Sequence, residues 1–388
     1  MNKAILNIQI QEFINDNLET DLVKLALKGS PFPAVTIQEL ITQIESKNKA
    51  KQKLPSWFNT ENIYYPPKLN LEQTSSEITA QYKASLVSGK SLADITGGLG
   101  IDSYYFAKSF EKVYHFEIDK DLSEIASHNF SQLNSKVTCI AENGITSIDT
   151  MFFDIIYMDP SRRHDSKGKV FYLNDCEPNV VEQLDYLLKR CDLLLVKTSP
   201  MLDITEGLRE LKHVFEVHIV AVKNEVKELL WLVKKGHTGD LILKTVNLKS
   251  NKIEFFEAPF PSSGTTVYSN PKKYIYEPNA AIMKSGLFFS LSNQYQVEKM
   301  AVNTHLFTSD EKIAFPGRGF DVLNSVPYSK AEIKKHFSGK RANITTRNFP
   351  ETVAALKQRW KIKDGGDKYL FFTTNKDKKK VILECVKI

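Results

Sequence analysis

The 388-residue sequence lacks three features that would define whole classes of protein. Its four cysteines include no Cys-x-x-Cys pair, so they predict neither a zinc site nor a disulfide framework. No apolar run approaches the roughly 18 residues that indicate a transmembrane helix. Polar residues interrupt the apolar positions at the N-terminus, which therefore makes a poor secretory signal. A soluble cytoplasmic protein without a bound metal is expected.

Core-forming residues, by contrast, are plentiful. Hydrophobic residues make up 42% of the chain and charged residues 25%, and there are 23 Phe and 15 Tyr. A disordered protein would carry far fewer large apolar side chains. The length and this composition together predict two or three folded domains.

The positive charge is concentrated at the C-terminal end of the chain. Residues 317–388 hold 17 Lys and Arg against 7 Asp and Glu, a net charge of +10, whereas the other 316 residues hold 35 against 39, a net charge of −4. Such an asymmetry favours a polyanionic partner for the basic segment. The alternative is a solvated lysine-rich surface, with Lys376 and Lys378 to Lys380 at a hairpin tip.

Helical spacing of apolar residues dominates the first 85 residues, with an extended connector expected over 55–73. From residue 91, short apolar strands alternate with amphipathic helices at 100–109, 121–133 and 179–190. This alternation predicts an α/β fold with a mainly parallel sheet. The predicted strands are Ser91–Ile95, Lys112–Glu117, Lys136–Ile140, Asp154–Met158 and Asp192–Lys197, followed by 214–222, 228–234, 240–248 and 252–257.

Pro, Ser and Gly between 259 and 271 indicate a linker, and Phe315-Pro316-Gly317-Arg318-Gly319 indicates a further boundary. Residues 328–388 predict the order helix, strand, helix, strand, strand, which is a compact α+β module. The predicted organisation is therefore an N-terminal helical region (1–85), an α/β domain (86–260), a small region (272–316) and a basic α+β module (317–388).

A glycine-rich turn follows the first predicted strand. Asp94, Thr96, Gly97, Gly98 and Gly100 lie between this strand and the next helix. The glycines allow a sharp turn and a close approach of the backbone to a ligand, and the helix beyond them offers free N–H groups. An ordinary strand-to-helix turn is the alternative. Position 103 is Ser, so the third glycine of a dinucleotide fingerprint is missing.

Further polar residues follow the neighbouring strands. Glu117 ends the second strand, where an acidic side chain can accept both hydroxyls of a ribose, and Ile118 could pack on an adenine ring. Glu142 and Asn143 follow the third strand, where either could receive an adenine amino group. Ser76 and Thr79 could line the opposite end of a bound cofactor, although Ser76 could equally cap the next helix.

At these residues the sequence resembles class I S-adenosylmethionine-dependent methyltransferases. Asp94 to Gly100 is similar to their first motif, Glu117 to their ribose-binding acid, and 159–163 to their fourth motif. Residues 72–83, 94–98 and 197–203 together resemble one bacterial family of methyltransferases with a ferredoxin-like insert and a C-terminal THUMP-like domain. This resemblance covers residues 60–388. It implies a Rossmann-like sheet, S-adenosylmethionine as cofactor, and RNA, either tRNA or rRNA, as partner.

The fourth motif implies the methyl-acceptor site. Asp159-Pro160 leaves the fourth strand, and Asp159 is the candidate to orient an amine or hydroxyl for in-line transfer. Lys197 leaves the fifth strand toward the same face. There it is expected either to make a catalytic contact or to form a structural ion pair. Substrate contacts are expected from Ser161, Arg162 and Arg163, because Arg binds phosphate with two hydrogen bonds, although these residues could form a solvated loop.

Three functions stay open from the sequence. The first is methyl transfer to RNA, with the basic module binding the RNA backbone. The second is methyl transfer to a protein or a small molecule. The third is RNA binding without catalysis on a degenerate fold, against which the intact set Asp94, Gly98, Gly100, Glu117 and Asp159 argues.

Overall fold

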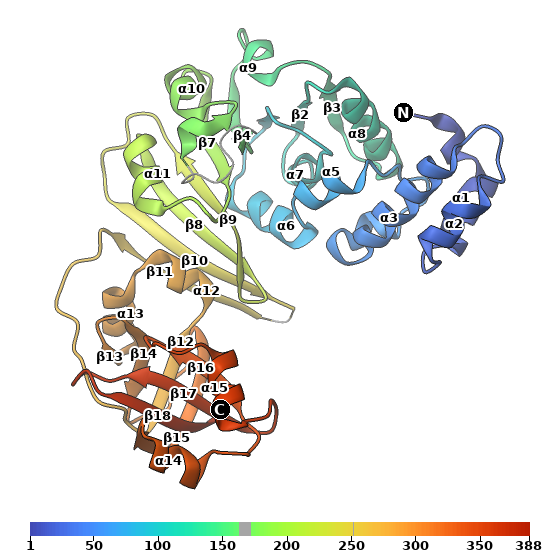
Figure 1. Cartoon of the computed structure of the whole chain (residues 1–388). Helices are drawn as coiled ribbons and strands as arrows, with labels where there is room; N and C mark the ends of the chain where they lie inside the picture. The colour runs from blue at the N-terminus through green and yellow to red at the C-terminus, as the bar shows by residue number, and fades with distance from the viewer. Residues whose placement is uncertain (163–171, 251) are drawn as a thin grey trace. The chain divides into compact units, whose positions relative to one another are not determined.

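The computed structural model describes residues 1–162, 172–250 and 252–388 (Figure 1). The chain forms two compact units. The first comprises 1–215 and 230–238, and the second comprises 216–229 and 239–388. None of the described helices is both long and apolar enough to span a bilayer.

Short helices build the N-terminal part of the first unit. Its longest helix, α3, starts with a capping box in which Thr36 and Glu39 each bond the other's backbone N–H. The expectation of an extended connector over 55–73 is wrong in part, because Pro55 opens a short helix and Trp57 and Leu71 are fully buried. The elements are η1 (Lys3–Leu6), α1 (Ile8–Asp16), α2 (Leu22–Lys28), α3 (Ile37–Lys53), α4 (Pro55–Phe58), α5 (Lys68–Gln73) and α6 (Glu77–Leu86).

A parallel sheet follows, with five strands in the order β7-β4-β1-β2-β3. These are β1 (Ser91–Asp94), β2 (Lys112–Phe116), β3 (Val137–Ile140), β4 (Phe153–Met158) and β7 (Cys191–Thr198). A further strand, β9 (Glu225–Val233), follows β7 in the sheet order. The connecting helices are α7 (Ile101–Phe106), α8 (Lys120–Gln132), α9 (Gly144–Ser147), α10 (Val180–Leu187) and α11 (Ile204–Glu210). The predicted α/β fold class is confirmed.

The segment between β4 and α10 begins and ends as a two-stranded ribbon. β5 (Ser161–Arg162) pairs antiparallel with β6 (Cys176–Glu177), which follows η3 (Leu173–Asp175). This pairing joins the two ends of the connection between β4 and α10.

The second unit starts with β8 (Val214–Val222, from residue 216), β10 (Leu241–Lys249) and β11 (Lys252–Phe260). β8 and β10 are parallel, whereas β10 and β11 are antiparallel with Lys249 opposite Lys252. Asn251, between the two strands, lies outside the described residues.

The rest of the second unit is one seven-stranded sheet in the order β13-β14-β12-β15-β18-β17-β16. Its strands are β12 (Tyr274–Pro278), β13 (Glu298–Ala301), β14 (Thr304–Ser309), β15 (Gly317–Pro327), β16 (Asn343–Arg347), β17 (Lys368–Thr374) and β18 (Lys380–Lys387). The accompanying helices are α12 (Ala280–Ser285), α13 (Phe288–Tyr295), α14 (Lys330–His336) and α15 (Val353–Trp360).

The boundary predicted at 315–319 falls inside this sheet. Gly317 begins β15, which pairs antiparallel with β12. A Cβ at Gly317 would lie 2.1 Å from the carbonyl oxygen of Glu277, so this glycine serves a close approach of two strands. Residues on both sides of position 316 therefore share one hydrogen-bonded sheet.

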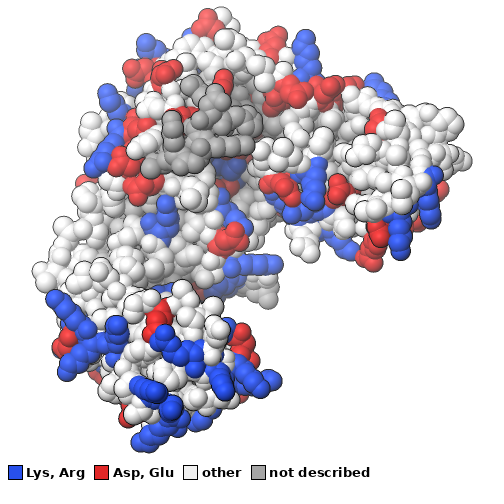
Figure 2. All heavy atoms as spheres, viewed as in Figure 1, with Lys and Arg blue, Asp and Glu red and all other residues white. Residues whose placement is uncertain are grey.

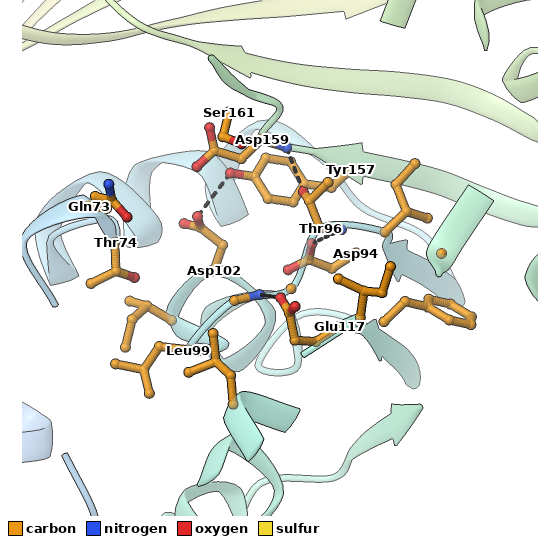
Figure 3. A pocket seen from close by; sticks show the side chains of 18 of the residues that line it. Gln73, Thr74, Asp94, Thr96, Leu99, Asp102, Glu117, Tyr157, Asp159 and Ser161 are labelled. Atoms are coloured by element: carbon orange, nitrogen blue, oxygen red, sulfur yellow. Dashed lines mark hydrogen bonds between the residues drawn. The ribbon is translucent and has the colours of Figure 1, made fainter. Parts of the chain in front are cut away.

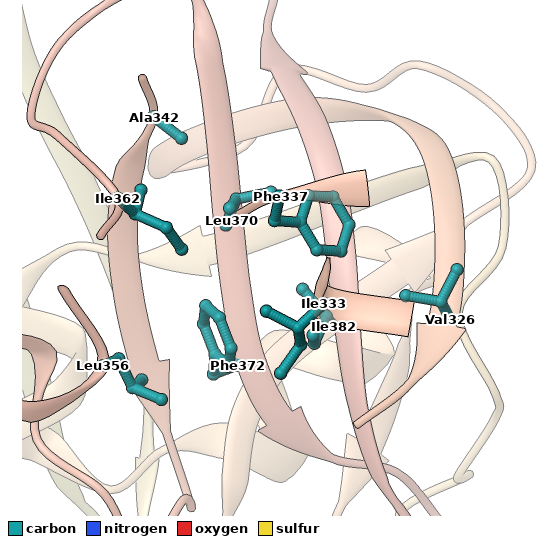
Figure 4. Close-up of a cluster of buried hydrophobic side chains, with 9 residues drawn as sticks. All are labelled: Val326, Ile333, Phe337, Ala342, Leu356, Ile362, Leu370, Phe372 and Ile382. Atoms are coloured by element: carbon teal, nitrogen blue, oxygen red, sulfur yellow. The ribbon is translucent and has the colours of Figure 1, made fainter. Parts of the chain in front are cut away.

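Alternate residues of β17 enter two different cores. Leu370 and Phe372 join α14 and α15 in one apolar cluster, drawn in Figure 4, whereas Phe371 packs with Ile275 and Phe320 on the other face. This is the two-residue period of a strand that is buried on both faces.

A buried carboxylate also joins β12 to its neighbour β15 and to β16 at the end of the sheet order. Glu277 is 5% exposed and forms ion pairs with Arg318 of β15 and Arg347 of β16. Each buried charge of this kind needs its partners, so the triad ties the early and late parts of the sheet together.

Candidate functional site

A cavity of about 490 Å³ opens at the carboxyl ends of β1, β2 and β4 in the first unit. In Figure 3, Tyr157, Asp159 and Ser161 lie on one side of it, and Leu99 and Glu117 lie on the other. Open α/β sheets bind ligands at this edge. The lining comprises Asn70, Gln73, Thr74, Ser75, Asp94, Ile95, Thr96, Gly97, Gly98, Leu99, Ile101, Asp102, Phe116, Glu117, Ile118, Leu122, Asn143, Gly144, Tyr157, Asp159, Ser161, Glu177 and Pro178.

The glycine turn forms one wall of the cavity. A Cβ at Gly97 would lie 2.3 Å from the His115 ring, and a Cβ at Gly100 would lie 2.3 Å from Phe130, so these positions have no room for a side chain. Gly98 has a φ of +55° and no atom within 4 Å of its Cβ position. The turn thus presents bare backbone to the cavity at Gly98.

Glu117 is held at the end of β2 by backbone donors. Its Oε2 accepts the N–H of Gly98 at 2.8 Å, and its Oε1 accepts the N–H of Asp119 at 2.8 Å. The next residue, Ile118, is 69% exposed on the cavity lining. An anchored acid and a free apolar side chain therefore lie next to each other, as the sequence predicts.

Asp94 lies at the floor of the turn. It accepts the hydroxyl of Ser103 at 2.6 Å and the N–H of Thr96 at 3.2 Å, and it is 1% exposed. Burial raises the pKa of Asp94 to about 8, with a further contribution from the nearby charge of Asp102. A cation bound beside it would favour the carboxylate form.

A buried polar network that the sequence does not predict adjoins the cavity. Asp102 Oδ2 accepts the hydroxyls of Ser75 at 2.7 Å and Tyr157 at 2.9 Å, and its Oδ1 lies 3.2 Å from Nζ of the fully buried Lys83. Burial opposes the charge of Asp102, but the positive charges of Lys83 and Lys197 outweigh it and lower the pKa. The network fastens the segment before β1 to the sheet.

Asp159 and Lys197 form an ion pair beside this network. The backbone N–H of Asp159 donates to the hydroxyl of Thr96 at 2.7 Å, which fixes the residue at the exit of β4. Its carboxylate pairs with Lys197, and the Asp159 side chain is one-third exposed. A fixed, accessible acid beside a cation can orient the N–H or O–H of a second ligand.

The structure brings most of the predicted site residues together. Asp94, Thr96, Gly97, Gly98, Glu117, Ile118, Asn143, Asp159 and Ser161 line the cavity, and Lys197 reaches it through Asp159. Gly100 and Pro160 are buried next to the lining residues. Arg162 contributes backbone to β5, while Arg163 lies outside the described residues.

Besides the residues that adjoin the cavity without lining it, the structure holds Ser76, Thr79 and Glu142 in other contacts. Ser76 caps α6 by accepting the N–H of Thr79, and Thr79 donates its hydroxyl to the Ser76 carbonyl. Glu142 accepts the hydroxyl of Ser147 at 2.7 Å and stays exposed. The preceding residues Gln73, Thr74 and Ser75 occupy the wall that Ser76 and Thr79 were expected to form.

Two lining residues, Asp102 and Tyr157, can be predicted only partly from the sequence. Asp102 ends the glycine-rich run and Tyr157 immediately precedes Met158 and Asp159, but nothing in their spacing connects them to Ser75. Among the described residues, no group of three or more His, Cys, Asp or Glu could hold a metal ion.

Comparison with known proteins identifies two domains in the second unit. Residues 274–316 match a family model of a ferredoxin-like domain, and residues 317–387 match a THUMP domain-like model. No curated protein matches the chain.

One solved structure matches over the whole length. A crystal structure described as a "putative methyltransferase from Porphyromonas gingivalis W83" is 30% identical, covers 100% of this chain and 99% of its own, and superposes with a TM-score of 0.89. An rRNA methylase from Streptococcus thermophilus is 16% identical over 42% of this chain and 98% of its own, with a TM-score of 0.29. A match at 16% identity with a TM-score of 0.29 carries no conclusion about the function of this chain.

Proposed function

The chain belongs to the same family as the Porphyromonas gingivalis protein described as a methyltransferase, and from this premise we propose that it transfers a methyl group from S-adenosylmethionine to RNA. The THUMP domain-like match and the net charge of +10 over 317–388 support RNA as the acceptor. A cytoplasmic location remains a prediction from the sequence.

The residues of the cavity fit an adenosyl sulfonium. Gly98 offers bare backbone, Glu117 has its carboxylate at the end of β2, and Ile118 presents an uncovered apolar surface. We assign ribose binding to Glu117, adenine packing to Ile118 and contacts to the amino-acid end to Gln73, Thr74 and Asp94. A volume of about 490 Å³ lies within the range of small-molecule sites.

The charge of the cavity agrees with a cationic ligand. The acidic side chains of Asp102, Glu117 and Asp159 line it, and a bound cation would favour the carboxylate form of Asp94 as well. When bound, S-adenosylmethionine supplies an electrophilic methyl group on a positively charged sulfur, and negative groups around it favour binding.

Asp159 and Lys197 would act on the acceptor. Asp159 is fixed through its backbone by Thr96 and keeps one-third of its side chain exposed. Its carboxylate would align the acceptor's N–H or O–H and hold the proton, while Lys197 limits its movement. Ser161, Arg162 and Arg163 stay predicted contacts to the RNA.

One observation carries the proposal. The bare backbone of Gly98, the anchored Glu117 and the accessible Asp159 all line a single cavity at the edge of a parallel sheet. A structural turn alone would need neither the open space beside Gly98 nor the accessible acid opposite it.

A transfer assay tests the proposal. The full-length protein is incubated with S-adenosylmethionine labelled in its methyl group and with total RNA, total protein or small metabolites from a strain that lacks the gene. We expect label in RNA and no label when Asp159 is replaced by Ala.

The other functions predict different results. Label in protein or metabolites only would show a different acceptor, and binding of RNA without any response of thermal stability to S-adenosylmethionine would indicate a non-catalytic RNA-binding protein. Mass spectrometry of nucleosides with and without the gene would then identify the modified base.

A further inference from the structure

The turns that follow α14 and α15 are hydrogen-bonded to each other. Gly339 N–H donates to the carbonyl of Trp360 at 3.2 Å, Lys363 N–H to that of Lys340 at 3.0 Å, and Ala342 N–H to that of Lys363 at 2.9 Å. These bonds place cations from separate segments side by side. We call this group the basic edge; it comprises Lys334, Lys335, Lys340, Arg341, Lys361 and Lys363.

All six side chains of the basic edge belong to exposed residues. Within the described ranges, none of them lies within ion-pair distance of an acidic group. The nearest acids along the chain already have partners, since Glu332 pairs with His336 and Asp364 with Lys357. Figure 2 shows Lys and Arg outnumbering Asp and Glu on the visible face of this part of the chain.

Four other cations of the same domain are paired with carboxylates. Arg318 and Arg347 share Glu277, Arg359 pairs with Glu351, and Lys368 pairs with Glu384. Cations at the end of a helix interact favourably with its dipole, which accounts for Lys334 and Lys335. The helix dipole does not account for Lys340, Arg341 and Lys363. Six positive charges in one place also repel one another, which opposes their grouping.

The basic edge also contains exposed backbone. Gly339, Gly365 and Gly366 have positive φ angles, and no atom lies within 4 Å of the Cβ positions of the first two. The side-chain amide of Asn343 donates to the carbonyls of Gly366 at 2.8 Å and Lys368 at 3.3 Å, which holds the second glycine turn in place. The Gly339 N–H is already bonded to Trp360, so an anion can approach the side chains of the basic edge together with the exposed backbone of the turn at Gly365 and Gly366.

We propose that the basic edge binds the phosphate backbone of an RNA. The inference rests on the proposed function for the choice of RNA, and it adds the surface that the RNA contacts. Cations distributed over three chain segments and held by backbone bonds suit a flexible polymer with regularly spaced phosphates.

A second lysine group in the same domain provides the matched control. Lys376, Lys378, Lys379 and Lys380 lie at the turn between β17 and β18, where Asn375 accepts the N–H groups of Asp377 and Lys379. This tip carries four exposed lysines, the same number of cations as the experiment removes from the basic edge. All four belong to a single turn, which also contains Asp377.

The experiment compares two full-length quadruple variants. The edge variant is K340Q/R341Q/K361Q/K363Q, and the tip variant is K376Q/K378Q/K379Q/K380Q. Binding of a fluorescently labelled total tRNA pool is measured by anisotropy between about 50 and 200 mM salt, without S-adenosylmethionine. Thermal unfolding with and without S-adenosylmethionine is recorded for both variants.

The edge variant is expected to bind tRNA about tenfold or more weakly, and the slope of log K against log salt should fall by about 3, since each lost phosphate contact removes about 0.7–0.9. The tip variant should lose less than about one unit of slope. Equal losses in both variants, or an unchanged edge variant, would overturn the assignment.

Two further outcomes separate the alternatives. Binding of the unmodified protein to phosphatidylserine vesicles but not to tRNA would overturn RNA as the occupant in favour of an anionic membrane. Edge-dependent tRNA binding without methyl transfer to any RNA would sustain the basic edge and refute the proposed function, so the two can fail separately.

Discussion

The acidic groups of the cavity and the basic groups of the basic edge lie in opposite environments. In the cavity wall, Asp94 and Asp102 are at least nine-tenths buried, and each accepts hydrogen bonds from named donors. At the basic edge, Lys340 and Lys363 are exposed, and no acidic partner lies near them among the described residues. A buried charge without partners destabilises the fold by about 3–5 kcal/mol or is neutralised by a proton, whereas an exposed charge without partners costs little and stays available to a ligand.

This difference predicts where a substitution acts. Changes in the cavity wall should alter the free energy of unfolding and cofactor binding together. Changes at the basic edge should alter RNA binding and leave folding almost unaffected.

The largest effect is expected from Lys83→Met. The substitution leaves Asp102 buried beside the cavity without its closest positive partner, which should lower the free energy of unfolding by about 3–5 kcal/mol. Urea unfolding followed by tryptophan fluorescence measures this change. Lys340→Met at the basic edge is the control. A similar loss of unfolding free energy in both variants would contradict the difference between the cavity wall and the basic edge.

A smaller loss is expected from Gly97→Ala. Its Cβ would lie 2.3 Å from the buried His115 ring, whose Nε2 is 3.1 Å from the carbonyl of Gly98. Overpacking of this kind costs about 1–3 kcal/mol, and the displaced turn should also weaken binding of S-adenosylmethionine. Calorimetry measures the binding and thermal unfolding measures the stability. Unchanged binding would show that the turn does not contribute to the cofactor site.

Asp94 gives the first unit a specific pH dependence. Because its pKa is raised to about 8 from about 4, the folded state holds a proton that the unfolded state has lost. The contribution of Asp94 to stability is thus complete below about pH 4 and falls by about 1.4 kcal/mol per pH unit as the pH rises toward 8. Asp94→Asn should remove this slope, and an identical pH profile for both proteins would refute the raised pKa.

The smallest effect on folding is expected at the basic edge. Replacing Lys340 and Lys363 by Gln removes two exposed charges, so the free energy of unfolding should change by less than about 0.5 kcal/mol. The midpoint of thermal unfolding measures it. A large destabilisation would show that these cations have structural partners and that the contrast with the cavity is false.

Local patterns in the sequence predict the strands and the glycine turn well. The bounds of β8 agree with the predicted range 214–222, and β1 and β2 each end one residue before their predicted ranges, because alternating or continuous apolar residues define these strands and turn residues delimit them. Gly97, Gly98 and Glu117 are predicted from the same local order of strand, turn and helix. The sequence therefore predicts the half of the cavity that is built from consecutive residues.

The other half depends on contacts between distant segments. Lys83, Asp102 and Tyr157 come from two helices and a strand, and only the tertiary fold brings them together. The same holds for the pairing of β12 with β15, which joins the regions on either side of the boundary predicted at 315–319. Ser76 could be predicted as a helix cap or as a cavity residue, and only the hydrogen bond to Thr79 decides between them.

Titration calorimetry with S-adenosylmethionine tests the cavity most directly. We expect one molecule bound per chain, binding weakened about tenfold or more (about 1.4 kcal/mol) by Glu117→Ala, and no change on Glu142→Ala, since Glu142 lies outside the cavity lining. Absence of binding by both S-adenosylmethionine and its demethylated product, or equal binding by the wild type and Glu117→Ala, would contradict the assignment.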